Sequence, residues 1–268
     1  MTDNETKLAT HFAFGENWES YSKLIDDKKI GDATSGLLAF VGPLAGRSFL
    51  DIGCGSGLHA LSALGIGVSS ITAIDIDPKS VETTQATLSR FADGAAWRAE
   101  TVSVLSPDFD QLGQFDVVYS WGALHHTGNM REAIKRAAQH VKSGGLFAIA
   151  IYSKTPFCAA WRVEKRLYTY SPKYVQNTLF WAYKLTMDSL IWAKSTITGT
   201  RKNLGRGMDI NHDYRDWIGG YPYDSATPAE SDALVLPLGF HKVRQKVPKR
   251  NFMGLFGTGC AEYLYKRS

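Results

Sequence analysis

The stretch Phe49-Leu50-Asp51-Ile52-Gly53-Cys54-Gly55-Ser56-Gly57 decides the fold of this chain. Its apolar start predicts a buried strand. Glycine at alternate positions then lets the backbone turn sharply and approach a ligand without interference from Cβ atoms. A helix that begins near Gly57 would point free N–H groups at an acceptor lying there. This pattern is typical of the cradle that holds a nucleotide-type cofactor.

The spacing of the glycines distinguishes this loop from the loop of NAD-dependent enzymes. Dinucleotide enzymes carry G-x-G-x-x-G, whereas Gly53, Gly55 and Gly57 give G-x-G-x-G, which weakens the NAD interpretation. Eighteen residues after Gly57 a second strand ends at Asp75, whose carboxylate can accept both hydroxyls of an adenosine ribose. Asp77 is then expected to cap the following helix.

Strand and helix patterns alternate over the first 152 residues. Apolar runs rich in β-branched residues predict five strands, at residues 48–52, 70–75, 96–102, 115–120 and 146–152. Helical patterns follow the second and fourth strands, and Gly144-Gly145 is expected to end the later helix. This alternation predicts a parallel sheet with helices on both faces.

The C-terminal part predicts a different arrangement. Thr227-Pro228-Ala229-Glu230 has the cap, the proline and the third-position glutamate of a helix start, and the helix should run to about Leu236. Two strands, at residues 240–247 and 260–266, can pair antiparallel through a loop at 248–259. A mostly parallel sheet closed by a terminal hairpin is therefore expected.

About 75 residues before Thr227 are not needed by this sheet. We expect one domain over residues 1–268, with a helical segment at 1–47 and a helical cap inserted at 153–226. Apolar residues recur at helical spacing from Tyr174 to Ala193, but Lys184 and Asp188 interrupt them, so no membrane span is expected.

Residues 153–216 hold 11 Lys or Arg against 5 Asp or Glu. Such a segment can meet an anionic substrate, a membrane surface or RNA, or it can be a solvated helix face.

The composition is that of a soluble globular protein. With 268 residues, 44% of them hydrophobic and 21% charged, the chain can form one large domain. Cys54, Cys158 and Cys260 are widely spaced and support neither a disulfide framework nor a CxxC zinc site. We therefore expect a reducing compartment and no metal. The first five residues lack the basic and apolar regions of a secretory signal, which indicates the cytoplasm.

Taken together, these motifs resemble those of the class I S-adenosylmethionine-dependent methyltransferases over nearly the whole chain. The matching stretches are residues 50–57, 74–77, 115–120 and 142–145. The chain looks closest to bacterial proteins similar to the ubiquinone-biosynthesis O-methyltransferases, on residues 120–128, 14–18 and 216–223. The resemblance implies an α/β fold. Its doubly wound, seven-stranded Rossmann-like sheet would have a terminal antiparallel hairpin and a helical insertion between the fifth and sixth strands.

The resemblance also implies roles in binding S-adenosyl-L-methionine. Asp51 and the loop glycines would hold its methionine part, Asp75 its ribose, and Ser103-Val104 the adenine edge. Many relatives carry aspartate where Ser103 stands, although a serine hydroxyl can still accept that bond. The expected cofactor-binding residues are Trp18, Asp51, Gly53, Cys54, Gly55, Gly57, Asp75, Ile76, Ser103, Val104, Ser120 and Trp121.

The chemistry mainly requires that a nucleophile be aligned behind the sulfonium methyl and that water be excluded. An alcohol acceptor would need a base, and the candidates are His125 and His126, which follow the fourth strand. The same histidines could instead shape their loop through backbone hydrogen bonds. His212-Asp213 in the insertion is a second candidate base.

Acceptor recognition is expected from the insertion and from the N-terminal segment. Arg162, Lys165 and Arg166 fall on one helical face, which could bind a phosphate or carboxylate or could be solvated. Trp18 and Tyr21 could close over the cofactor or simply pack as aromatics. The expected acceptor-binding residues are Tyr21, Arg162, Arg166, His212 and Tyr221.

The leading expectation is methyl transfer to a small molecule, at an oxygen of a quinone-like, aromatic, isoprenoid or lipid- or sugar-linked metabolite. The alternatives are C-methylation of a small molecule, methylation of RNA through the basic insertion, and a non-catalytic partner subunit. The complete cradle argues against the last. We recognise no RNA-binding module, so neither RNA nor DNA is the expected partner. Peripheral contact with lipid is left open, and the sequence does not predict an oligomeric state.

Overall fold

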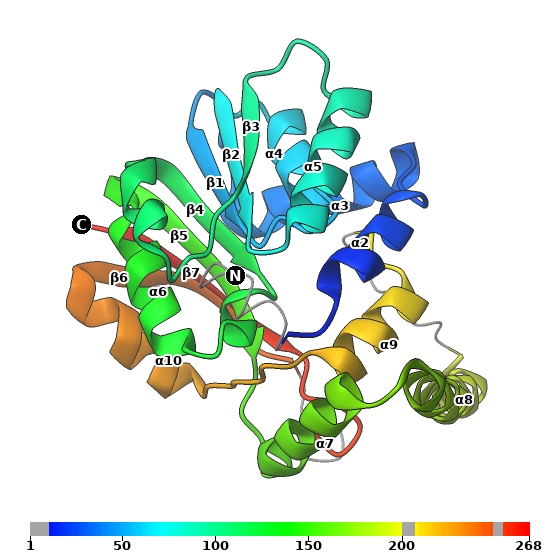
Figure 1. Cartoon of the computed structure of the whole chain (residues 1–268). Coiled ribbons are helices and arrows are strands. Elements are labelled where there is room, and N and C mark those ends of the chain that lie inside the picture. Colours follow the sequence, from blue (N-terminus) through cyan, green and yellow to red (C-terminus); the bar gives the residue numbers. More distant parts are fainter. Residues whose placement is uncertain (1–10, 200–206, 249–253) are drawn as a thin grey trace.

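A seven-stranded sheet with strand order β3-β2-β1-β4-β5-β7-β6 runs through the molecule (Figure 1). The computed structural model describes residues 11–199, 207–248 and 254–268. The strands are β1 (Ser48–Ile52), β2 (Ser70–Asp75), β3 (Trp97–Thr101), β4 (Phe115–Trp121), β5 (Val141–Tyr152), β6 (Phe240–Lys246) and β7 (Cys260–Arg267). The predicted α/β class, with its Rossmann-like sheet, is confirmed.

Helices cover both faces of the sheet and form the insertion. They are α2 (Phe14–Ser22), α3 (Asp27–Val41), α4 (Leu58–Gly65), α5 (Pro78–Phe91), α6 (Met130–Gln139), α7 (Cys158–Tyr170), α8 (Lys173–Thr198), α9 (Ile210–Gly219) and α10 (Pro228–Val235). Short 3-10 turns are η1 (Pro107–Leu112), η2 (Leu124–His126) and η3 (Leu236–Leu238). Among the described stretches, no helix has both the length and the hydropathy needed to cross a bilayer.

The two faces of the sheet form two apolar layers because successive strand residues point to opposite sides. On one face Leu50 and Phe147 pack with the apolar sides of α6 and α10. On the other face Phe49 and Val117 pack with α3, α4 and α5. All four side chains are completely buried. Each contributes about 1.5 to 3 kcal/mol through removal of apolar surface from water.

The crevice for a ligand is set by strand β1, which pairs in parallel with β2 on one side and with β4 on the other. The chain therefore leaves β1 and β4 toward opposite edges of the sheet, and a crevice opens between these two connections. Ligands of such sheets bind in this crevice, beyond the carboxyl ends of the strands. The Ser120 hydroxyl on β4 donates to the Ile52 carbonyl on β1 at 2.8 Å. This bond fixes the two strand ends beside the glycine loop.

Strand β7 pairs antiparallel with both β5 and β6 and so lies between them. Its side chains Tyr263 and Tyr265 are completely buried in the layer that also holds Leu50. The antiparallel pair expected at the C-terminal end is thus present. Residues 249–253 of the loop expected between its strands lie outside the described residues.

The largest difference from the predicted boundaries lies between α6 and β5. Gly144-Gly145 does not end a helix, because α6 ends at Gln139 and β5 already begins at Val141. Phe115 pairs with Val141 but Val117 with Leu146, so the extra residues of β5 bulge out of the ladder. A Cβ on Gly145 would lie 2.8 Å from the Lys142 carbonyl oxygen, which explains the need for glycine in the bulge.

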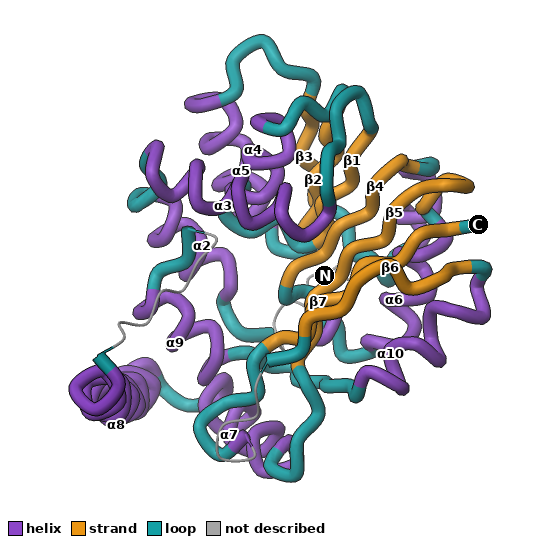
Figure 2. Tube along the Cα trace, turned by 180° about the vertical axis from the view of Figure 1, so that it is seen from behind, coloured by secondary structure: helices purple, strands orange, loops and turns teal. Residues whose placement is uncertain are grey.

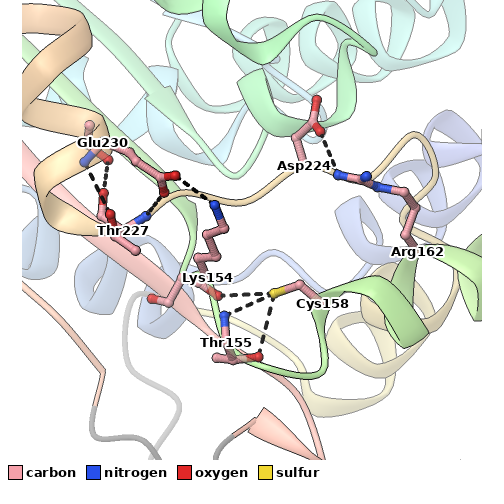
Figure 3. Close-up of polar contacts among 9 residues, drawn as sticks. Lys154, Thr155, Cys158, Arg162, Asp224, Thr227 and Glu230 are labelled. Carbon is pink, nitrogen blue, oxygen red and sulfur yellow. Dashed lines mark hydrogen bonds and ion pairs between the residues drawn. The ribbon is translucent and has the colours of Figure 1, made fainter.

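The insertion, residues 153–226, contributes α7, α8 and α9 between β5 and α10. Its start and its end are joined by ion pairs, which Figure 3 shows from Lys154 to Glu230 and from Arg162 to Asp224. These pairs measure 2.7 Å and 3.1 Å. Thr227 and Glu230 also form the expected capping box of α10. The insertion is therefore fastened at its base, next to the sheet.

Candidate active site

A cavity of about 360 Å³ lies where the carboxyl ends of β1, β2 and β4 meet α2 and the insertion. The sheet side of its wall comes from the glycine loop, Asp75, Ser103-Val104 and Trp121. The opposite side comes from helices and from the strands next to the insertion. The lining residues there include Phe14, Trp18, Tyr21, Tyr152, Asp213, Asp216, Trp217 and Cys260.

The glycine loop lies directly against its neighbours. Gly55 has φ of +51°, and a Cβ there would lie 3.1 Å from the Trp18 indole. A Cβ on Gly53, which has φ of +80°, would overlap the Ala123 methyl group. Trp18 therefore covers the loop from α2, so closely that a side chain on Gly55 would push the indole back by a few tenths of an ångström. The loop has the bare backbone expected of a cofactor cradle.

Helix α2 is held over the loop by a second close approach. The Gly15 amide donates to Asp77 Oδ2 at 2.9 Å, and a side chain on Gly15 would overlap that carboxylate. The other oxygen of Asp77 accepts from the Lys79 amide at 2.9 Å and caps α5, as predicted. One carboxylate thus starts α5 and positions the helix that carries Trp18.

Two buried acids lie beneath the loop. Asp75 accepts from the Gly55 amide at 3.2 Å and from the Asp77 amide at 3.0 Å, and burial raises its pKa to about 6. Asp51 is only 2% exposed, and its Oδ2 has no hydrogen-bond partner among the described residues. Burial and the charge of Asp75 raise the pKa of Asp51 to about 7. Asp51 thus offers an acceptor atom that only a ligand or water could satisfy.

The insertion places carboxylates in the same cavity. Asp213 and Asp216 are three residues apart on α9, so they lie on one face of that helix. Burial, helped by the charge of Asp213, raises the pKa of Asp216 to about 7. Among the described residues we find no hydrogen bond to the Asp216 carboxylate. A carboxyl group with this pKa in a cavity wall can take up or release a proton near neutral pH.

A buried lysine lies behind this wall. Lys165 of α7 is completely buried, and its Nζ is 3.9 Å from the centre of the Trp217 ring. Tyr223, Trp161 and Tyr152 surround the ammonium at 5.5 to 6.0 Å. No described residue forms a hydrogen bond with Nζ. Burial lowers the pKa of Lys165, and the charges of Glu164 and Asp216 oppose that shift.

Nine of the twelve expected cofactor residues line the cavity. They are Trp18, Gly53, Cys54, Gly55, Asp75, Ile76, Ser103, Val104 and Trp121. The other three, Asp51, Gly57 and Ser120, lie outside the lining. Gly57, with φ of +77°, is the N-cap of α4, and Ser120 is the buried bridge to β1. Among the expected acceptor-binding residues, Tyr21 lines the cavity, and its hydroxyl donates to the Gly207 carbonyl at 2.6 Å.

The two arginines expected to bind the acceptor lie away from the cavity. Arg162 donates to the Tyr223 carbonyl and to Asp224 at 3.2 Å and 3.1 Å. Arg166 lies in a separate shallow groove beside Leu167. The expected single face of three cations is also wrong, because Lys165 points into the body of the protein while Arg162 and Arg166 are exposed. The aromatic cluster around Trp217 determines this orientation.

His212 and Tyr221 also have other neighbours. His212 Nδ1 lies 2.7 Å from Asp209 Oδ1, at the start of α9, and its Nε2 lies 3.2 Å from the Ser20 hydroxyl. The Tyr221 ring packs against Tyr170 with 6.0 Å between centres. Neither residue lines the cavity. The His212 contact with Ser20 joins α9 to α2, and the Tyr221 contact with Tyr170 joins the segment after α9 to α7.

The two candidate histidine bases differ in position. His126 lines the cavity, but its Nδ1 lies 2.8 Å from the Pro222 carbonyl, which can only accept, so this nitrogen carries the proton. Burial lowers the pKa of His126 to about 3. His125 is completely buried outside the lining, with its ring 3.9 Å from that of Tyr152, and burial lowers its pKa as well. Both imidazoles are neutral at pH 7.

The sequence indicated no site role for Asp216, named Asp213 only beside His212 as a candidate base, and placed Lys165 on a face that could bind an anion. The pair of carboxylates at i and i+3 was a usable signal, because both fall on one helical face. The stretch 216–223 was noted only as a motif of a subgroup. Nothing in the sequence marked Lys165 as buried, since its neighbours along the chain, Glu164 and Arg166, are charged.

Comparison with known proteins identifies a domain in part of the chain. Residues 50–147 match the family described as "Methyltransferase domain". A tRNA U34 carboxymethyltransferase of Aeromonas salmonicida (strain A449) is 34% identical over 109 residues, which are 41% of this chain and 33% of that protein. The same enzyme of Serratia proteamaculans (strain 568) is 38% identical over 90 residues, 34% of this chain and 27% of that protein. The chain thus spans about a third of the length of these relatives.

Solved structures share the fold at low sequence identity. Magnesium protoporphyrin IX methyltransferase of Synechocystis PCC 6803 with bound S-adenosylmethionine has a TM-score of 0.57 and 14% identity, over 100% of this chain and 99% of that chain. The N-methyltransferase NodS of Bradyrhizobium japonicum WM9, with S-adenosyl-L-homocysteine, has a TM-score of 0.52 and 13% identity, over 91% and 90% of the two chains.

These findings support the broad resemblance and not its finer part. The chain carries an S-adenosylmethionine-dependent methyltransferase domain with the class I fold. The expected closeness to ubiquinone-biosynthesis O-methyltransferases is not supported, because the curated relatives compared above are tRNA U34 carboxymethyltransferases.

Proposed function

We propose that this chain transfers the methyl group of S-adenosylmethionine to a hydroxyl group of an acceptor bound in the same cavity. The observation that carries the proposal is the shared wall. Asp75 and the glycine loop line one side of the cavity, and Asp216 of the insertion lines the other. A methyl donor and an acceptor can then be held together away from bulk water, which is what this transfer requires.

The residues present fit the donor. Asp51 keeps a buried acceptor atom without a partner, and Gly53 and Gly55 have positive φ and sit where a Cβ would meet Ala123 and Trp18. In the proposed complex Asp51 and the loop hold the methionine part, Asp75 accepts from the ribose hydroxyls, and Ser103-Val104 line the adenine. S-adenosylmethionine supplies an activated methyl group on a positively charged sulfur.

Asp216 is the proton acceptor that we propose on the other side. A hydroxyl nucleophile must lose its proton as it attacks, and a base with a pKa near the working pH is most effective. The pKa of Asp216 is raised to about 7, and its carboxylate has no hydrogen bond to a described residue that would compete for the proton. His126 is less suited to this role because its pKa lies near 3, and His125 is outside the cavity lining.

The cavity wall favours an aromatic or otherwise apolar acceptor. Phe14, Tyr152 and Trp217 present rings there. Rings of this kind stack on planar groups and cover isoprenoid chains. A small-molecule acceptor with a hydroxyl on such a framework therefore agrees with the chemistry of the wall.

RNA is a second candidate acceptor, favoured by two observations. The similar curated proteins are named for tRNA, and residues 153–216 carry a net charge of +6 from 11 basic and 5 acidic residues. A flipped-out base could enter an aromatic cavity, and basic residues could hold the backbone. This candidate predicts binding to tRNA that weakens steeply with salt. Either acceptor would be met in the cytoplasm, where we propose the chain acts.

The first test measures binding of S-adenosylmethionine and S-adenosylhomocysteine by calorimetry, with Asp75→Ala as the negative control. The lack of heat from a folded sample with either ligand would refute the proposal.

The second test incubates the enzyme and a methyl-labelled donor with total tRNA, or with an extract freed of nucleic acid by nuclease. Label in tRNA alone would favour the second candidate, and label in a small organic product would favour the first.

A further inference from the structure

Helix α8 exposes a row of large apolar side chains. Tyr174, Trp181, Leu185 and Trp192 are each 60 to 74% exposed. Their separations of seven, four and seven residues place them on one side of the helix, because two turns take about seven residues. The row is about 27 Å long at 1.5 Å per residue. In Figures 1 and 2 α8 lies at the outer edge of the molecule, away from the sheet.

The other side of α8 is already used for packing. Phe180 is buried against the insertion, and Tyr183 and Met187 pack on the same aromatic cluster. The Tyr183 hydroxyl also donates to the Phe256 carbonyl at 3.2 Å. The helix is therefore held to the body by one face, and the exposed row lies on another face, in contact with solvent.

Helix α7 repeats this exposure. Val163, Leu167 and Tyr170 are 56 to 65% exposed at positions i, i+4 and i+7. A monomeric protein rarely leaves so many large apolar side chains in water on neighbouring segments. Both rows belong to the insertion, and the sheet-covering helices have no comparable row among the described residues.

The charge around these rows is basic. Residues 158–198 contain six Lys or Arg against two Asp or Glu. Lys165 is completely buried, and Arg162, Lys173 and Lys184 form ion pairs. Arg166 and Lys194 form no ion pair with a described carboxylate. Such a surface attracts anionic headgroups, whereas two copies of it would repel each other if they met face to face. An RNA would contact cations and would leave the apolar row itself without a partner.

We propose that α8 docks on a membrane surface that contains anionic lipid, with Trp181, Leu185 and Trp192 inserted between the headgroups. Tyr and Trp combine an apolar ring with a polar atom, and they prefer this boundary. The helix would lie in the plane of the interface, as amphipathic helices with basic flanks do. The absence of a spanning helix among the described residues agrees with a peripheral contact. The inference is independent of which acceptor the cavity takes.

The test is flotation of the full chain with lipid vesicles. We expect binding to vesicles of phosphatidylcholine with a quarter phosphatidylglycerol that is at least about tenfold tighter than to phosphatidylcholine alone. Trp181→Ser with Trp192→Ser should weaken that binding at least about tenfold, because the inserted area is lost. The matched control is Leu38→Ser with Val243→Ser, which removes two apolar side chains of 41% and 50% exposure elsewhere and should change nothing.

A second variant guards against misfolding. Leu185→Glu places a negative charge within the row, and its circular dichroism and melting temperature should match the wild type while vesicle binding is lost. The proposal is overturned if the wild type does not float, or if these variants float as well as the wild type. It is also overturned if the protein does not bind vesicles and the exposed row instead mediates dimerisation, measured by sedimentation, or binds RNA.

Discussion

The cradle, residues 51–57 with Asp75, and the insertion both bury charged groups, but they hold them in different ways. In the cradle, Asp75 accepts two backbone amides from residues close to it along the chain or across the sheet. In the insertion, the side chains of Lys165 and Asp216 come from two helices, and Lys165 Nζ forms no hydrogen bond with any described residue. Backbone geometry defines the first site, and side-chain packing of separate helices defines the second. Four predictions test this difference.

The largest effect is expected at Asp75. Replacing it by Ala should weaken S-adenosylmethionine binding by roughly 100-fold, because charge-assisted hydrogen bonds contribute about 1.5 to 3 kcal/mol each. Calorimetric titration measures the change. Asp110→Ala, which removes an exposed carboxylate paired with Arg136, is the control and should bind normally. Equal affinities of the two variants would show that the cradle does not depend on its acid.

The next effect concerns Asp51 and the stability of the free protein. Its pKa is raised to about 7 from 3.8, so the native state holds its proton more tightly than the unfolded state does. The free energy of unfolding therefore falls as the pH rises from about 4 to 7, because the buried carboxyl group loses its proton and becomes charged. It stays at this lower value at pH 8. A pKa shift of this size corresponds to roughly 4 kcal/mol, and because a buried asparagine amide keeps part of the desolvation cost, Asp51→Asn should stabilise the protein by about 2 kcal/mol at pH 8 and by almost nothing at pH 4. Urea unfolding at both values measures this, and a gain of the same size at both would contradict it.

Lys165 should show the opposite pH dependence. Burial lowers its pKa, so the ammonium destabilises the native state fully below the folded pKa, and the penalty fades as pH rises toward 10.5. Lys165→Met should raise the free energy of unfolding by about 1 to 2 kcal/mol at pH 6, and the gain should shrink by pH 9. Arg166→Met, the exposed neighbour, is the control and should have little effect at either pH. A destabilised Lys165→Met protein would mean that the cation is needed for the insertion to pack.

The smallest effect is at the base of the insertion. Thr227→Ala removes the cap of α10 and should cost about 1 kcal/mol in thermal or urea unfolding. Its partner Glu230 has a pKa lowered to about 2, so its contribution is present above pH 4.5 and is lost as pH falls through 2. Thr178→Ala on the exposed side of α8 should be neutral. A neutral Thr227→Ala would show that the ion pairs alone fasten the insertion.

The sequence predicted the sheet and the cradle well because their signals are local. Strand β1, the glycine loop and Asp75 are each specified by a few consecutive residues, and the alternation of strands and helices determined the architecture. The capping residues Asp77 and Thr227 were equally local. The error at Gly144-Gly145 arose because a bulge depends on the register of a neighbouring strand, which periodicity does not contain.

The acceptor side could not be predicted in the same way. Lys165 lies in a charged stretch of sequence, and only the packing of Trp217 and Tyr223 from distant segments buries it. Asp216 enters the cavity because α9 rests against α2, a contact between residues about 200 positions apart, as the Asn17 bond to the His212 carbonyl shows. Helical periodicity gave a face for each helix but not the partner of that face.

The position of β7 has a consequence for biosynthesis. Because β7 lies between β5 and β6, residues 240–246 have no neighbour in the sheet until residues 260–267 have left the ribosome. Cys260 at the start of the same strand also lines the cavity. The five N-terminal strands can form while translation continues, but a nascent chain cannot complete the ligand site before this late strand is inserted. We expect ribosome-bound chains to become protease-resistant in two steps, the second on release of β7.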